Sequence, residues 1–186
     1  MLSSLDIYNT PAYPVKDAAR YLRIPVATLR SWLRGRSYST KKGQKVIEPF
    51  IQRPDRTLPQ LSFINLVEAY VIRNVRETHQ VELDQVLPFG KIAMQEGLKD
   101  LFSRVDWNPD GIPIRFFPII ESLPDDDKTI FIDPSIRFGR PVIAGKGIRT
   151  ETIANLINAG DSIEDVANEF GCTVEQVIAA IRFEAQ

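Results

Sequence analysis

The side chains best suited to chemistry lie between residues 28 and 45, and nearly all of them are cationic or hydroxylic. Guanidinium and ammonium groups bind phosphate oxygens, and arginine and serine side chains also donate to the edges of DNA bases. This spacing predicts a DNA-contacting surface. Its members are Thr28, Arg30, Ser31, Arg34, Arg36, Lys41, Lys42 and Lys45.

The charge of the 186-residue chain is unevenly divided, although its net value is only −1. Residues 16–56 hold 11 cations and three anions, whereas residues 121–186 hold six cations and 12 anions. A basic N-terminal part followed by an acidic C-terminal part predicts that the N-terminal part binds a polyanion. The C-terminal part is then expected to have another role.

Two short helices position the first cations. Apolar residues recur with helical spacing over residues 15–22, and Pro25 suits the start of a second helix over residues 26–33. Leu29 and Leu33 should face inward, Trp32 should straddle interior and solvent, and Gly35 should end the helix. Two helices joined by so short a turn indicate a helix-turn-helix.

The remaining cations fall on an expected hairpin over residues 37–51. Gly43 is expected in its turn, with Lys41, Lys42 and Lys45 beside it and Val46 at the start of the return strand. A cationic hairpin next to a recognition helix is suited to hold a phosphate backbone, as a wing does.

The middle of the chain is less distinctive. A helix is expected over residues 59–75, with Ser62 as its N-cap. Because nearly its whole surface is apolar, we expect it to be buried, either within this chain or in a homodimer. An amphipathic helix is expected over residues 91–105, an edge strand over residues 112–120 and a linker over residues 122–127.

The acidic end predicts three helices that begin at Thr150, Ser162 and Thr173, with Asp165 and Gln176 as capping-box partners. The last two resemble a second helix-turn-helix, but exposed glutamates on the third helix would repel phosphate. We therefore expect this part to bind protein or to dimerise. The glycines of residues 131–150 lack the spacing of a phosphate loop and indicate tight turns instead.

The predicted fold is mainly α, with an N-terminal winged helix-turn-helix that includes a small β hairpin and a C-terminal three-helix, helix-turn-helix-like domain. The expected domains are residues 1–80, 81–127 and 128–186, the middle one being a connector.

Several classes of protein are disfavoured. The longest uncharged stretch, residues 57–67, is too short to span a membrane, and no secretory signal is apparent. Cys172 and His79 are the only cysteine and histidine, so no disulfide, metal site, cofactor site or catalytic pair is expected. We expect a cytoplasmic protein that is not an enzyme.

Two resemblances sharpen these expectations. The residues Ala18-Ala19, Leu22, Ile24, Thr28-Leu29-Arg30 and Trp32 resemble the MerR-type winged helix-turn-helix, which implies that Arg30 contacts DNA and that Trp32 sits at the backbone. Asp133-Pro134, Phe138 to Ile143, Gly145, Gly147-Ile148 and Gly160 to Ala167 resemble a small bacterial domain of antitoxins encoded beside PIN-like ribonuclease toxins.

Together the two parts resemble VapB-type antitoxins. The resemblance implies a homodimer that binds operator DNA, represses its own transcription and neutralises a PIN-like toxin. The cations Arg137, Arg140, Lys146 and Arg149 are candidates for entering the acidic centre of such a toxin. The alternative is a MerR-like transcription regulator whose C-terminal part binds a ligand or another protein.

Overall fold

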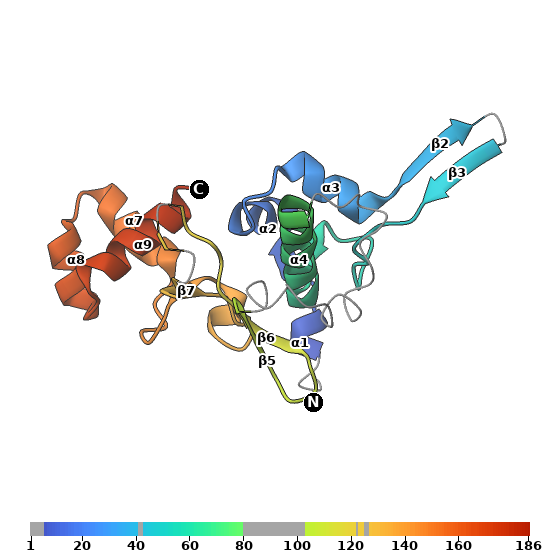
Figure 1. The fold of residues 1–186 in the computed structure, drawn as a ribbon. Helices are drawn as coiled ribbons and strands as arrows, with labels where there is room; N and C mark the ends of the chain where they lie inside the picture. Colours follow the sequence, from blue (N-terminus) through green and yellow to red (C-terminus); the bar gives the residue numbers. More distant parts are fainter. Residues whose placement is uncertain (1–5, 41–42, 80–102, 122, 125–126) are drawn as a thin grey trace. The chain divides into compact units, whose positions relative to one another are not determined.

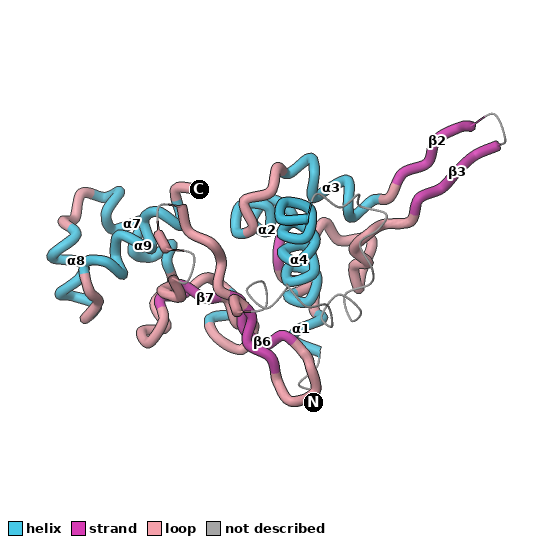
Figure 2. The backbone as a smooth tube through the Cα atoms, viewed as in Figure 1, coloured by secondary structure: helices cyan, strands magenta, loops and turns pink. Residues whose placement is uncertain are grey.

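The computed structural model describes residues 6–40, 43–79, 103–121, 123–124 and 127–186 (Figure 1). The chain divides into an N-terminal unit, residues 1–98, and a C-terminal unit, residues 99–186. Helices hold more of the described residues than strands do, and the strands form two-stranded pairs (Figure 2). The expected mainly α class, with a helix-turn-helix first and a helical domain last, is confirmed. No helix in the described ranges is long and apolar enough to cross a membrane.

The N-terminal unit is built around a helix-turn-helix. Its elements are α1 (Asp6–Asn9), β1 (Tyr13–Pro14), α2 (Val15–Tyr21), α3 (Val26–Arg34), β2 (Arg36–Thr40), β3 (Gly43–Ile47), β4 (Gln60–Leu61) and α4 (Phe63–His79). The turn between α2 and α3 bends through Arg23, whose φ of 53° is left-handed, and Pro25 is the N-cap of α3. The two predicted helices are thus confirmed to within one residue at each end.

The wing follows α3 directly. Gly35, with a φ of 67°, ends α3, and β2 and β3 then pair antiparallel (Figure 1). Gly43 pairs with Thr40 as the first residue of β3, so it flanks the turn and does not form it. Val46 lies near the end of the return strand, not at its start, because β3 ends at Ile47.

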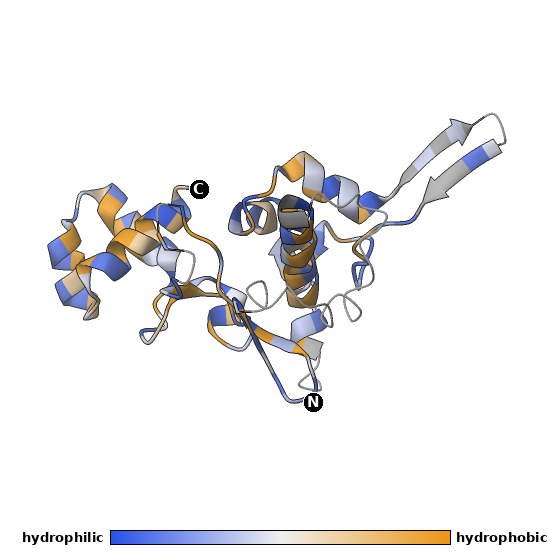
Figure 3. Cartoon of the chain, in the orientation of Figure 1, coloured by the Kyte–Doolittle hydropathy of each residue, from blue (hydrophilic) through white to orange (hydrophobic). Residues whose placement is uncertain are grey.

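The long helix α4 forms the core of this unit. Ser62 Oγ accepts a hydrogen bond from the Asn65 amide at 3.2 Å, which confirms the predicted N-cap. Phe63, Leu66 and Val67 are fully buried, so packing within the unit accounts for the apolar surface of α4 (Figure 3). The expected helix over residues 59–75 is too long at its start, because residues 60 and 61 form β4, which pairs with β1.

The C-terminal unit starts with short strands. They are β5 (Val105–Trp107), β6 (Pro113–Phe116), β7 (Ile130–Phe131) and β8 (Val142–Ile143). Val105 belongs to β5, which corrects the end of the helix expected over residues 91–105; residues 91–102 lie outside the described residues. Phe116 pairs with Val105 on one side and exchanges two backbone hydrogen bonds with Ile132 on the other. The prediction of an edge strand is therefore wrong at Phe116.

Three helices complete this unit, namely α7 (Thr150–Ala159), α8 (Ile163–Phe170) and α9 (Val174–Glu184). Ser162 and Thr173 are N-caps as predicted, and Thr173 and Gln176 form a full capping box. Thr150 is not a cap: it is the first residue of α7, is fully buried, and donates its hydroxyl to Glu184. Ile143, Ile153, Val166 and Val177 form the core between the helices.

Candidate nucleic-acid interface

The helix α3 presents its cations on one side and packs the other into the core. Arg30 and Arg34, four residues apart, are exposed, whereas Leu29 is fully buried and Leu33 nearly so. Ser31 is half-buried, and its hydroxyl donates to the carbonyl of Thr28 at 2.8 Å. The sequence-predicted residues of α3 are therefore brought together, and the guanidinium groups of Arg30 and Arg34 are exposed donors on its surface.

Trp32 departs from its expected position. Only 3% of its surface is exposed, so it belongs to the core and does not straddle interior and solvent. The guanidinium of Arg76 on α4 lies 6.0 Å from the centre of the indole ring. The indole therefore fixes α3 against α4, and a place at the DNA backbone is not available to its ring.

A second cationic segment, which we call the arginine loop (residues 51–59), lies beside α3. The Trp32 carbonyl accepts from the amides of Phe50 and Ile51, at 2.9 and 3.3 Å, at the start of the loop. At its end, the Pro59 carbonyl accepts from the Val15 amide at 3.2 Å. Since both ends are tied to the helix-turn-helix, the loop is held in a fixed position next to α3.

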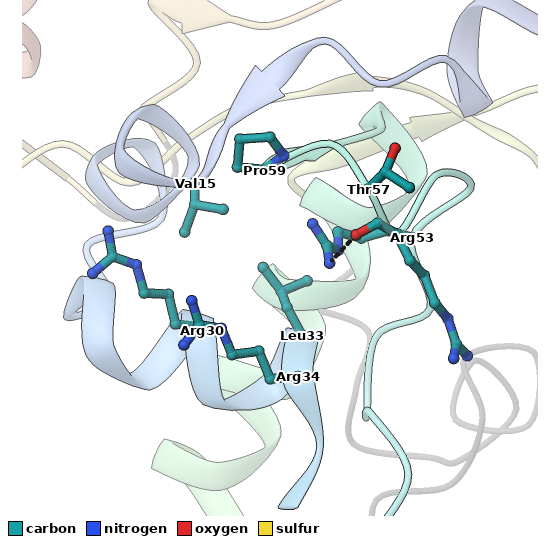
Figure 4. Close-up of a pocket in the computed structure, with 8 residues that line it drawn as sticks. Val15, Arg30, Leu33, Arg34, Arg53, Thr57 and Pro59 are labelled. Atoms are coloured by element: carbon teal, nitrogen blue, oxygen red, sulfur yellow. Dashed lines mark hydrogen bonds between the residues drawn. The ribbon is translucent and has the colours of Figure 1, made fainter.

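Arginines from both segments line one cleft of about 370 Å³ (Figure 4). Figure 4 places Arg30 and Arg34 of α3 opposite Arg53 and Thr57 of the arginine loop. The full lining is Val15, Arg30, Leu33, Arg34, Arg53, Arg56, Thr57 and Pro59. A cleft with four guanidinium groups in its lining is suited to an anion such as a backbone phosphate.

Hydrogen bonds inside the loop hold its shape. The Arg53 guanidinium donates to the carbonyl of Leu58 and, at 3.0 Å, to that of Arg56. Asp55 accepts from the amide of Thr57 at 2.8 Å and from its hydroxyl at 2.6 Å. Both bonds lower the pKa of Asp55, and the bond from the Thr57 hydroxyl has the larger effect. Arg53 is thus partly engaged within the loop, whereas Arg56 is exposed.

The wing cations are only partly described. Arg36 opens β2 opposite Ile47, and Lys45 lies opposite Tyr38, but the structure does not describe their side chains. Lys41 and Lys42, expected at the tip, lie outside the described residues. The sequence did not single out Arg53 and Arg56 as site residues, and the one signal for them was their presence in the basic block.

The cations predicted to meet a toxin lie on the turns before α7, and all four are exposed. Arg137 Nε donates to the carbonyl of Gly147 at 3.0 Å, which places Arg137 beside the residue that follows Lys146. The bridge between Val142 and Arg149 places Arg149 opposite a residue two positions after Arg140. The Lys146 ammonium lies beside Gly171, and Arg149 pairs with Glu151 at 4.0 Å. The four therefore border adjoining turns, where the side chains of Arg137, Lys146 and Arg149 already have neighbours in the unit.

Residues for other chemistry are not assembled in the described ranges. No group of three His, Cys, Asp or Glu side chains there could hold a metal ion. Burial raises the pKa of the Cys172 thiol, although Lys146 partly opposes the shift, so this cysteine is a poor nucleophile at neutral pH.

Comparison with known proteins agrees with this division. Residues 11–89 match a family described as "Putative DNA-binding HTH domain", and residues 130–183 match one described as "Protein of unknown function (DUF433)". The first match contains α2, α3, the wing, the arginine loop and α4. The second contains β7, β8, α7, α8 and all of α9 except its last residue.

A relative and a solved structure span both parts. The chain is 25% identical to "Putative antitoxin VapB45" of Mycobacterium tuberculosis (strain ATCC 25618 / H37Rv), over 94% of each protein. Its fold is similar to the crystal structure of Rv2018 from Mycobacterium tuberculosis, with a TM-score of 0.59 and 18% identity, covering 94% of this chain and 99% of the other. The two-part architecture is therefore shared along nearly the whole chain.

Proposed function

We propose that this chain is the DNA-binding antitoxin of a toxin–antitoxin pair. Its N-terminal unit binds operator DNA, and its C-terminal unit neutralises a PIN-like ribonuclease toxin. The observation that carries the proposal is the meeting of α3 and the arginine loop, which brings arginines from two segments to one cleft on a helix-turn-helix. The relative named as an antitoxin, aligned over 94% of each protein, supports the same function.

In the DNA complex, α3 enters the major groove and Arg30 and Arg34 donate to phosphate oxygens or guanine edges. A phosphate next to the groove occupies the cleft between α3 and the arginine loop. The wing, with Arg36, Lys41, Lys42 and Lys45, follows the backbone. A homodimer reads two half-sites about one helical turn apart, and this occupancy represses transcription of the pair.

The toxin contact falls to the C-terminal domain, for which we keep the boundaries 128–186, with residues 81–127 as connector and residues 1–80 as the DNA-binding domain. PIN-like toxins cut RNA at a cluster of carboxylates. Arg137, Arg140, Lys146 and Arg149 are exposed cations in an otherwise acidic part of the chain. One of them neutralises the toxin's centre by pairing with its carboxylates.

The experiment is co-expression of this chain with the product of the adjacent reading frame. We expect that product alone to stop growth, and the pair to restore growth and to copurify as a complex. Deleting the C-terminal domain in the full operon context should abolish rescue, whereas Arg30→Ala should preserve rescue and reduce operator binding. A harmless neighbour that forms no complex would contradict the antitoxin function.

A further inference from the structure

Phe138 is the most exposed large apolar residue in the described part of the chain. Its side chain is 95% exposed, compared with 41% for Leu58 and 36% for Val174. It lies on the short turn η2 (Arg137–Gly139) between β7 and β8, and it makes no aromatic contact with the Phe117–Phe131 pair of the neighbouring core. Folding of the C-terminal unit therefore gains little from this ring.

The backbone that carries Phe138 is held in an unfavourable conformation. Arg137, Phe138 and Gly139 have φ values of 49°, 57° and 72°, so three successive residues are left-handed. This region costs a residue with a Cβ atom free energy that glycine avoids. A sequence selected for folding alone would favour glycine at position 138, as it has at position 139. Strained residues of this kind concentrate at sites of binding and catalysis.

The turn is fixed from both sides. Its own bonds run from the Gly139 amide to the Ile136 carbonyl at 3.0 Å and from the Arg140 amide to the Arg137 carbonyl at 3.1 Å. The preceding residue, Ile136, donates its amide to the carbonyl of Asp133 at 2.9 Å. The buried Asp133 side chain in turn pairs with Arg115 at 3.2 Å. The ring is therefore presented by a rigid support, which reduces the entropy lost when a partner encloses it.

Cations lie close to the exposed ring in the sequence. Arg137 and Arg140 flank it in the sequence, and both are exposed. The hydrogen bond from Arg137 Nε to the Gly147 carbonyl places Arg137 beside the turn that contains Lys146. An apolar centre with a charged rim is the usual arrangement of an interface anchor, and it complements a partner with the opposite charge.

We propose that Phe138 is the apolar anchor by which the C-terminal unit grips its protein partner, and that this partner has an apolar socket bordered by carboxylates. The inference rests on the proposed function, in which the partner is the toxin. Arg137 and Arg140 pair with the carboxylates at the rim while the ring fills the socket. The left-handed turn fixes the direction in which the ring enters.

The test compares Phe138→Ala and Phe138→Gly with a matched control, Val174→Ala, which truncates another exposed apolar side chain of the same unit. The full chain and the product of the adjacent reading frame are purified, and the dissociation constant and the melting temperature are measured. We expect both Phe138 variants to bind at least thirtyfold more weakly, as truncation of an aromatic hot spot does, and Val174→Ala to bind within about twofold of wild type.

The melting temperature separates binding from a structural role. Phe138→Gly relieves the strain of a left-handed backbone at a residue with a Cβ atom. The variant should therefore melt at or above the wild-type temperature although it binds the partner more weakly. A marked fall in melting temperature would show that the ring supports the fold, and would overturn the proposal. Wild-type binding by Phe138→Ala would overturn the anchor and leave the antitoxin function standing.

Two further outcomes separate the anchor from the function. If the wild-type chain fails to bind the adjacent product, the proposed function fails, and the anchor fails with it. Sedimentation of the chain alone completes the test. Self-association that is lost in Phe138→Ala would assign the turn to a second copy of this chain and would overturn an acidic toxin as its occupant.

Discussion

The Val15 amide donates to the Pro59 carbonyl at 3.2 Å, and this bond ties the first residue of α2 to the end of the arginine loop. Because the Trp32 carbonyl holds the other end of the loop, Arg53 and Arg56 cannot move away from α3 without breaking bonds to the helix-turn-helix. The cleft is thus organised before any DNA arrives, and little ordering is left to oppose binding.

Removing the cations of α3 should weaken DNA binding most. Arg30→Ala or Arg34→Ala should each cost about 1–3 kcal/mol if the guanidinium donates to a base edge, and should relax the preference for the operator over random DNA. The measurement is a titration of fluorescent duplex from the promoter upstream of the chain's own reading frame, with a scrambled duplex alongside.

The control for these variants is Arg182→Ala, which removes one exposed positive charge from α9 in the other unit. It should leave the affinity within about twofold of wild type. Equal losses for Arg182→Ala and Arg30→Ala would show that net charge, and not α3, determines the affinity.

The arginine loop should contribute through phosphate contact. Arg56→Ala should lower the slope of log affinity against log salt by about one unit, for operator and scrambled DNA alike, with an unchanged melting temperature. Lys41→Ala and Lys42→Ala in the wing should each have a similar effect on the slope. An unaltered slope in Arg56→Ala would remove this loop from the interface.

Arg53 should behave differently from Arg56, because it also holds the loop together. Arg53→Lys keeps the charge but cannot donate in the same fork to the carbonyls of Leu58 and Arg56. We expect it to lower both the melting temperature and the affinity, as Arg53→Ala does. Full affinity in Arg53→Lys would show that only the charge at this position matters.

Local signals account for what the sequence predicted well. Gly35 ends α3, Ser62 caps α4, and Thr173 with Gln176 forms a capping box, each through bonds or backbone angles within a few residues. Fold class and helix positions follow from such signals and from apolar spacing.

The features that the sequence did not predict depend on residues far apart in the chain or on tertiary context. The pairing of β1 with β4 and the bridge from Phe116 to Ile132 join segments that no short pattern relates. The arginine loop faces α3 only because Val15 and Trp32 hold its ends. Phe138 adopts angles that its own residue type disfavours, so local propensity points away from the observed turn.

Glu68 should make the stability of the N-terminal unit depend on pH. Burial raises its pKa above the usual 4.5, although the hydrogen bond from Asn65 at 2.9 Å partly opposes this. The folded state therefore favours the protonated carboxyl. Stability falls as the pH rises from the unfolded pKa through the raised folded pKa, and the full penalty is reached above the folded pKa.

Glu68→Gln removes that penalty and keeps an oxygen that can accept from Asn65. Its melting temperature should exceed that of wild type at pH 7, and the difference should vanish below about pH 4, where both side chains are neutral. Glu48→Gln, at an exposed position, serves as the control and should show a smaller difference across the same range. A pH-independent difference for Glu68→Gln would contradict the raised pKa.

Arg104 should be important for the stability of the C-terminal unit. Its side chain is buried, with 4% exposed, and one terminal nitrogen donates to the carbonyls of Phe117 and Pro118 at 3.1 Å and of Asp127 at 3.2 Å. Arg104→Met keeps most of the volume but leaves these buried carbonyls without that donor. We expect a loss of about 2–4 kcal/mol in the free energy of unfolding, measured by urea denaturation of the full chain.

The matched control is Arg182→Met, the same substitution at an exposed position of α9, which should change the free energy of unfolding by less than about 0.5 kcal/mol. Because the segment after β6 and the segment before β7 meet at Arg104, its loss should also loosen the strands that precede the Phe138 turn. Arg104→Met should therefore weaken toxin binding by softening the support of the ring, whereas Phe138→Gly weakens it with the fold intact. An Arg104→Met chain as stable as wild type would show that the three carbonyls do not depend on this guanidinium.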